Sequence, residues 1–252
     1  MNKAEIAAGI IVIILVIGIA FLVNKPSTTS ITTTSPSPAA ISTSVTSTYT
    51  STLTTTTPKI QYIYCVGSGT SPYTQVYYAP ISSTGIGTWQ ATTSYPVRMS
   101  ADCSIYNGYI YCVGSYAPPY TLAYYAPISS TGIGTWQATT SYPDGVAAGD
   151  CTVYNGYIYC VGSLTPPYTQ VYYAPISSTG IGTWQATTSY PVEINDAKCS
   201  IYNGYIYCVG SNTSPYTQAY YAPISSTGIG TWQATTSYPV EMKFAYCGIP
   251  GS

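Results

Sequence analysis

The chain has 252 residues, of which only 5% are charged, and its six basic and seven acidic residues give a net charge of −1. It contains 30 tyrosines, two phenylalanines and no histidine. The lack of histidine excludes Ser-His and Cys-His nucleophiles, imidazole metal ligands and histidine pH switches. The low net charge argues against a nucleic-acid partner, because such binding needs a basic surface. The length fits one or two domains.

The N-terminal segment is strongly apolar. Residues 6–23 carry no charge, and as a helix they would reach about 27 Å, close to the thickness of a bilayer core. The sequence therefore predicts one transmembrane anchor over residues 1–25. A cleaved signal peptide is the alternative, because Gly18-Ile19-Ala20 is a small-x-small motif after an apolar run.

The next segment, residues 26–58, consists mainly of serine and threonine with a few prolines. Such a composition cannot bury enough apolar surface to offset chain entropy. We expect a disordered stalk, either O-glycosylated or bare, reaching up to roughly 100 Å when extended.

Residues 59–252 contain four nearly identical repeats. The string YAPISSTGIGTWQATTSYP recurs four times, and its tryptophans (Trp89, Trp136, Trp184 and Trp232) are spaced by 47, 48 and 48 residues. A period in the forties, rich in Tyr, Thr, Val and Ile and punctuated by Gly and Pro, is typical of β-propeller blades. We expect an all-β fold, a four-bladed propeller with about 48 residues per blade.

Each repeat divides into four expected strands, A to D. In the second repeat, strands A and B are residues 103–106 and 109–113, joined by Asn107-Gly108, which is typical of a type I′ hairpin turn. Strand C lies around QVYYAPI and strand D around GTWQATT. The A–B and C–D turns share one end of the blade, and the B–C and D–A loops share the other.

The hairpin register predicts the disulfides. Counting outward from the turn, Cys103 faces Cys112 at a non-hydrogen-bonded pair, where Cα atoms approach to about 4.5 Å. The same register pairs Cys151 with Cys160 and Cys199 with Cys208. Metal-binding cysteines are the weaker alternative, because the spacing is unusual for zinc. The bridges place the domain outside the cytoplasm.

Two cysteines remain, at opposite ends of the repeats. Cys65 stands in a strand B that has no strand A before it, and Cys247 stands where a strand A would lie without a following strand B. We expect the two to close the propeller as a split blade with a Cys65–Cys247 bridge.

The order NGYIYCVGS, VYYAPI and GTWQATTSYP resembles kelch repeats. Gly114, Tyr125 and Trp136 match the family pattern, whereas Ser115 stands where the family has a second glycine. The resemblance covers residues 59–247 and implies a β-propeller. Most kelch-like propellers have more than four blades, so two chains sharing one ring is the alternative to a four-bladed ring. Kelch-like propellers are chiefly binding scaffolds, and a minority are enzymes.

Differences between the repeats are concentrated in the B–C and D–A loops, which we name the loop face. All charged residues of the domain except Lys59 lie in D–A loops. With the loop tyrosine Tyr116, considered for carbohydrate stacking, the candidate binding residues are Arg98, Asp102, Asp144, Asp150, Glu193, Asp196, Lys198, Glu241 and Lys243. Divergence limited to one set of loops favours a recognition surface, although loops also tolerate change and charges need solvent.

The predicted function is a non-enzymatic adhesion or binding protein, anchored in a cell membrane or virion surface with the propeller outside, taking a protein or glycan ligand. No cofactor or metal is expected, although Asp102 and Asp150 with Asp196 or Glu193 form a weak alternative for a Ca²⁺ site. Asn212 begins the sole N-x-[ST] sequon of the sequence, lies in the loop face and is a candidate glycosylation site. The alternative function is a structural surface or filament subunit, a homo-oligomer that polymerises by strand exchange at the split blade. Catalysis is least favoured, since nothing marks an acid and a nucleophile.

Overall fold

The computed structural model describes residues 60–68, 71–99, 102–145, 149–194, 198–211 and 213–241, together with strands β1 (Thr29–Ser30) and β2 (Thr52–Leu53). The described residues form β-strands and connecting loops. Strands β1 and β2 pair antiparallel inside the segment predicted as a stalk. They belong to a separate compact unit, residues 21–60, and the repeats belong to the other.

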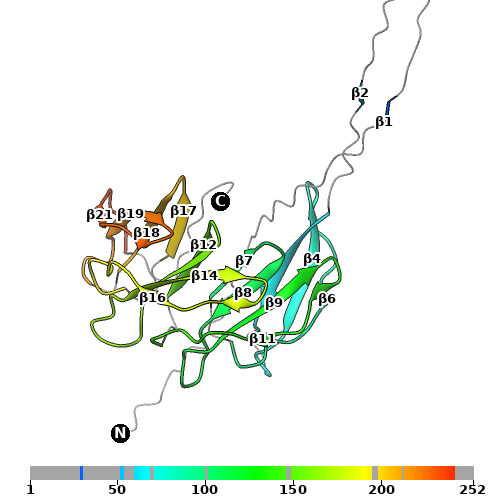
Figure 1. Ribbon diagram of the computed structural model, residues 1–252, viewed down its shortest axis with the longest axis horizontal. Helices are drawn as coiled ribbons and strands as arrows, with labels where there is room; N and C mark the ends of the chain where they lie inside the picture. The colour runs from blue at the N-terminus through cyan, green and yellow to red at the C-terminus, as the bar shows by residue number, and fades with distance from the viewer. Residues whose placement is uncertain are drawn as a thin grey trace, which may run out of the picture. The chain divides into compact units, whose positions relative to one another are not determined.

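Each repeat forms one antiparallel sheet, and Figure 1 shows the four sheets in chain order from cyan to orange. Repeat 1 contains β3 (Gln61–Val66), β4 (Val76–Ser82), β5 (Gly85–Ile86) and β6 (Gln90–Ala91). Repeat 2 contains β7 (Asp102–Tyr106), β8 (Tyr109–Val113), β9 (Ala123–Ser129), β10 (Gly132–Ile133) and β11 (Gln137–Ala138). Repeat 3 contains β12 (Asp150–Tyr154), β13 (Tyr157–Val161), β14 (Val171–Ser177), β15 (Gly180–Ile181) and β16 (Gln185–Ala186). Repeat 4 contains β17 (Lys198–Tyr202), β18 (Tyr205–Val209), β19 (Ala219–Ser225), β20 (Gly228–Ile229) and β21 (Gln233–Ala234).

The hairpin of strands A and B forms in the predicted register. Tyr106 pairs with Tyr109 across the two-residue turn, and Cys103 pairs with Cys112. Asn107 and Gly108 have φ values of 46° and 78°, as a type I′ turn requires at both positions. The turn chemistry therefore sets the pairing of β7 with β8, and the same holds for the hairpins of repeats 3 and 4.

The three predicted hairpin disulfides are confirmed. Each joins cysteines nine residues apart whose Cα atoms are 4.1 Å from each other; the pairs are Cys103–Cys112, Cys151–Cys160 and Cys199–Cys208. Disulfides of this kind indicate an oxidising compartment.

Cys65 is a half-buried free thiol, and the predicted Cys65–Cys247 bridge involves a residue outside the described ranges. Repeat 1 has no described strand A before β3, so Cys65 lacks the partner that the hairpin supplies in the other repeats. Cys247 lies outside the described residues, and the split-blade closure stays a prediction.

The structure corrects the prediction for strand D, which is split into two short pieces. In repeat 2, Ile133 pairs with Ile128, whereas Gln137 pairs with Tyr125, so that the strand D side contains one residue more than β9 between these pairs. This is a β-bulge. It lies opposite Pro127, which cannot donate to the ladder but accepts a hydrogen bond from the Gly134 N–H at 2.8 Å. The bulge contains Trp136.

The core lies between consecutive sheets rather than inside any one of them. Three clusters of buried residues join repeat 1 to 2, repeat 2 to 3 and repeat 3 to 4. We call each of these contacts between neighbouring repeats a joint. In the joint between repeats 2 and 3, the ring of Tyr142 meets the ring of Trp184 edge-on, with centroids 5.0 Å apart. The Trp184 indole N–H donates to the Thr140 carbonyl at 3.1 Å. Each repeat is therefore completed by the next one.

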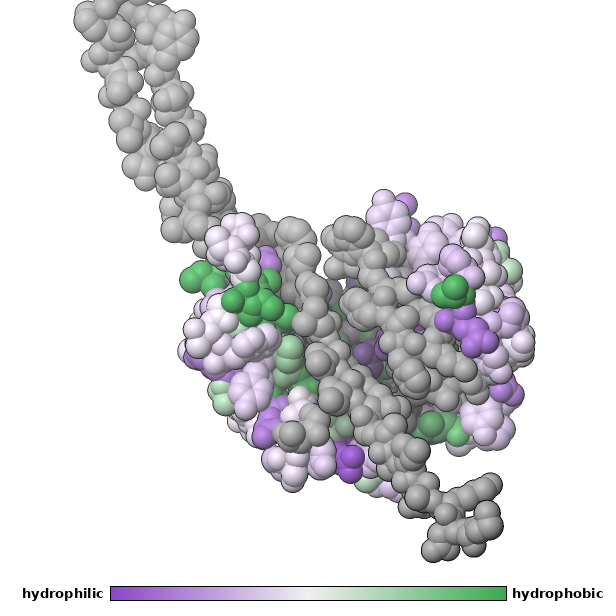
Figure 2. All heavy atoms as spheres, turned by 180° about the vertical axis from the view of Figure 1, so that it is seen from behind, coloured by the Kyte–Doolittle hydropathy of each residue, from purple (hydrophilic) through white to green (hydrophobic). Residues whose placement is uncertain are grey.

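The two ends of the array lack this completion. Trp89 of repeat 1 is 42% exposed, whereas its counterparts Trp136, Trp184 and Trp232 are 8–9% exposed. Tyr238 of repeat 4 is 43% exposed, whereas the equivalent tyrosines of the earlier repeats are buried. Among the coloured residues, the face in Figure 2 is mainly pale, as expected of Tyr, Ser and Thr.

Within the part of the chain that the structure describes, no helix is long and apolar enough to cross a membrane. The apolar segment 6–23, predicted as the anchor, lies outside that part.

Trp184 tests the energetic role of the joints. We expect Trp184→Ala to lower the free energy of unfolding by about 3–5 kcal/mol, because it leaves a cavity between two sheets and removes the indole hydrogen bond. Trp89→Ala is the matched control, and its loss should be less than half as large because this ring is 42% exposed. Denaturant unfolding of both variants measures the difference, and equal losses would contradict this account of the core.

Candidate functional site

The loop face brings together the B–C and D–A loops of neighbouring repeats. The Tyr116 N–H donates to the Arg98 carbonyl at 3.2 Å, and the Leu164 N–H donates to the Gly145 carbonyl at 2.7 Å. Each bond joins a D–A loop to the B–C loop of the following repeat. Ile194 N–H also donates to the Tyr168 carbonyl at 3.0 Å, which ties a D–A loop to the B–C loop of its own repeat. The variable loops of repeats 1 to 3 are thus tied to their neighbours by backbone hydrogen bonds.

Arg98 is the first of two side chains that fix these loops. Its guanidinium carbon lies 3.5 Å from the ring centroid of Tyr116 and 4.3 Å from that of Tyr73. These rings belong to the B–C loops of repeats 2 and 1. Stacking of this kind stabilises partly exposed cations, so Arg98 links the two loops. Tyr116, still 52% exposed, has one ring face covered by the guanidinium.

Asp144 plays the corresponding role between repeats 2 and 3. One carboxylate oxygen accepts from the Gly145 N–H at 2.8 Å, and the other accepts from the Thr165 hydroxyl at 2.6 Å. Leu164, beside Thr165, keeps 36% of its surface exposed. Position 144 therefore orients a B–C loop whose outer residue remains available to a ligand.

A second group of charges lies at the start of the innermost strands, and here the structure corrects the assignment to loops. Asp102, Asp150 and Lys198 are the first residues of β7, β12 and β17, and β12 contacts both of the other strands. The Lys198 ammonium lies 3.0 Å from Asp150 Oδ1. The three side chains form a row, which we name the inner row.

Each carboxylate of the inner row reaches the next repeat. Asp102 Oδ2 accepts from the Cys151 N–H at 2.5 Å, and Asp150 Oδ2 accepts from the Cys199 N–H at 2.7 Å. Burial, and then the charge of Asp150, raises the pKa of Asp102 to about 7 from an ordinary value of 3.8. Lys198 and the backbone N–H donors act in the opposite direction.

The Ca²⁺ alternative stays a prediction, because one of its ligands, Asp196, lies outside the described residues. The carboxylates of Asp102 and Asp150 accept hydrogen bonds from backbone N–H groups, and Asp150 also pairs with Lys198. Among the described residues, no cluster of three or more Cys, Asp or Glu side chains is placed to hold a metal ion. Glu193 and Glu241 are exposed. Asp196, Asn212 and Lys243, also predicted as site residues, lie outside the described ranges.

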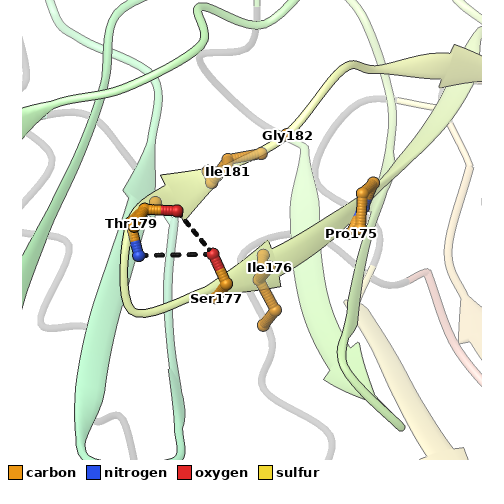
Figure 3. A pocket seen from close by; sticks show the side chains of 7 residues that line it. Pro175, Ile176, Ser177, Thr179, Ile181 and Gly182 are labelled. Atoms are coloured by element: carbon orange, nitrogen blue, oxygen red, sulfur yellow. Dashed lines mark hydrogen bonds between the residues drawn. The ribbon is translucent and has the colours of Figure 1, made fainter.

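A shallow hollow lies at the C–D turn of repeat 3, lined by residues such as Pro175, Ile176 and Ile181 (Figure 3). Ser177 Oγ accepts from the Thr179 N–H at 3.2 Å and lies 2.8 Å from the Thr179 hydroxyl. Because β14 runs from the B–C loop to this turn, the hollow is at the other end of the blade from the loop face. The same Ser-Thr contacts recur in the other repeats, so they belong to the turn and do not mark a distinct site.

Sequence reasoning found the loop face but not the contacts that build it. The Arg98 stack, the Asp144 bridge and the inner row each join residues of different repeats, which local patterns do not connect. The sequence did contain one indication of these residues: the rest of the repeats has almost no charge, so the charged residues Arg98, Asp144, Asp102, Asp150 and Lys198 stand out.

The repeated antiparallel sheets with their three disulfides fit a protein of the β-propeller class. Comparison with solved structures supports this fold: the chain is similar to YjhT, with a TM-score of 0.58 and 14% identity over 77% of this chain and 67% of that one. No family model matches the chain, and no curated protein matches it.

Asp102 predicts an unusual pH dependence. Because its folded pKa of about 7 lies above its ordinary value of 3.8, the folded state binds the proton more tightly than the unfolded state. The carboxyl therefore destabilises the fold above pH 7, and this penalty disappears as the pH falls towards 4. We expect the free energy of unfolding to rise over that interval.

Asp102→Asn should remove most of this slope and stabilise the protein at pH 8 by more than about 1.4 kcal/mol, the equivalent of one pKa unit. The matched control is Asp144→Asn on the loop face. Denaturant unfolding at pH 4 to 8 measures all three proteins. The same slope in the Asp102 variant and the parent would rule out this role for the carboxyl.

Proposed function

We propose that the chain is an extracellular binding protein, in which kelch-like propeller blades present the loop face to a protein or glycan ligand. One observation carries the proposal. The four repeats are almost identical in their sheets and turns and diverge in the loops, which in repeats 1 to 3 are tied to their neighbours by backbone hydrogen bonds. A rigid scaffold with varied loops is a common arrangement for recognition.

The chemistry of the loop face favours a glycan. Tyr116 and Tyr168 are 52% and 36% exposed, and Tyr168 has φ of 58°, in the left-handed region. Amphipathic rings of this kind present an apolar face and a hydroxyl together. Such rings can stack on the apolar face of a sugar, while their hydroxyls exchange hydrogen bonds with its hydroxyl groups.

The proposal includes a membrane anchor at residues 1–25 and a stalk at residues 26–58, with the repeats outside the cell or virion. The hairpin disulfides support an oxidising environment around the repeats. The carboxylates of Asp102 and Asp150 accept hydrogen bonds from backbone N–H groups. We take this as support for a non-enzymatic role, because neither carboxylate is left free to act as the acid or the nucleophile of a catalytic pair.

A glycan array probed with the full chain tests the proposal. The informative variant replaces every D–A loop with the version from repeat 2, which keeps the strands and removes the divergence. We expect binding by the parent, with no turnover of the bound glycan, and at least a tenfold loss in the variant.

The matched control carries Ser130→Glu and Ser178→Glu at the exposed C–D turns and should bind like the parent. Circular dichroism and melting verify that all three proteins are folded. Undiminished binding by the loop variant would remove the loop face as the site, and release of a cleaved product would favour an enzyme.

A further inference from the structure

The two ends of the repeat array have complementary surfaces. We name the exposed end of repeat 1 the leading face, made of Tyr77, Ile86 and Trp89. We name the exposed end of repeat 4 the trailing face, made of Tyr207, Thr235, Thr236 and Tyr238. We infer that the trailing face of one chain binds the leading face of a second copy of the same chain.

The joints inside the chain show what such a contact consists of. Tyr142 of repeat 2 meets Trp184 and Tyr172 of repeat 3 edge-on, with ring centroids 5.0 and 5.3 Å away. The Tyr111 hydroxyl donates to the Ser177 carbonyl at 2.8 Å. Joints between repeats 1 and 2 and between repeats 3 and 4 contain the same aromatic geometry. One interface is thus made three times.

The ends provide one half of this interface each. Tyr238 is the counterpart of Tyr142, while Trp89 and Tyr77 are the counterparts of Trp184 and Tyr172. The three end residues are 40–43% exposed. Ile86 is 52% exposed, whereas its equivalents in the later repeats are 3–4% exposed. Every aromatic group of a fourth joint is therefore present, but on opposite ends of the chain.

The backbone of the leading face has room for a partner. A Cβ added to Gly132 would collide with Thr92 and Tyr78 of the preceding repeat, and Gly180 and Gly228 are similarly enclosed. A Cβ at the equivalent Gly85 would meet nothing within 4 Å. In the joints inside the chain, a threonine of the preceding repeat fills the space beside this glycine, as Thr92 does beside Gly132. Its counterpart in repeat 4 is Thr235, which is exposed on the trailing face.

A second copy fits these faces better than closure within one chain. The four repeats belong to one compact unit, and in that arrangement both faces remain exposed. The likeness to YjhT covers 67% of that chain, so the matched residues correspond to part of the YjhT chain and not to all of it. Contact between unlike faces is heterologous and produces a ring or an open array of chains. Unlike strand exchange, it requires no strand to leave its own sheet.

Sedimentation velocity of the full chain in detergent, over a concentration series, tests the inference. One variant carries Ile86→Glu and Trp89→Glu on the leading face, and another carries Thr236→Glu and Tyr238→Glu on the trailing face. We expect the parent to associate with increasing concentration and each variant alone to associate at least tenfold more weakly. These positions are exposed, so both variants should keep the parent circular dichroism spectrum.

Mixing the two variants gives the decisive result. Each retains one intact face, so the mixture should form a one-to-one dimer that grows no further. The Ser130→Glu, Ser178→Glu protein is the matched control for added charge and should associate like the parent. A monomeric parent at all concentrations would show that the two faces do not bind each other between chains, and a mixture without dimers would exclude head-to-tail contact. Either result would overturn the inference.

Discussion

The edge-on contact between a tyrosine of one repeat and a tryptophan of the next is the interaction on which the structure depends. A single blade has little interior, because one sheet by itself leaves its faces uncovered. The tyrosine and tryptophan rings fill the space between two blades. The hydrogen bonds from the tryptophan indole N–H groups to threonine carbonyls of the preceding repeat then fix the register of one blade against the other. Stability is consequently a property of joints rather than of blades.

The near absence of charge follows from this construction. Packing sheets face to face on both sides leaves few solvated positions within a blade, so charges are confined to the loops and to the first residue of the innermost strand. Tyrosine replaces phenylalanine because its ring can be buried while its hydroxyl reaches a carbonyl of the adjacent repeat, as Tyr64 does with Ser129 at 2.7 Å. The rings are thus both core and connection between blades.

The sequence was sufficient to predict whatever depends on local turn geometry. The Asn-Gly turn determined the hairpin register, and the register determined three disulfides. Strand D was predicted less well, because its bulge arises where Pro127 interrupts the ladder and where Trp136 packs on another repeat. The differing exposure of Trp89 and Trp136 could not be read from the chain either, since both occur in the same string of residues. The inner row was predicted as loop charges, and only the placement of three strands side by side shows that Asp102 and Asp150 each bind the following repeat.

The uniformity of the joints has an evolutionary consequence. Because each joint uses the same residues, duplication or deletion of one complete unit of about 48 residues would create no contact that the protein does not already contain. The two cysteines of a unit lie within its own hairpin, so a new copy would bring its own bridge and would not disturb the pairing of the others. Length in this architecture can change by recombination in single steps, while the loops of each added copy are available to diverge.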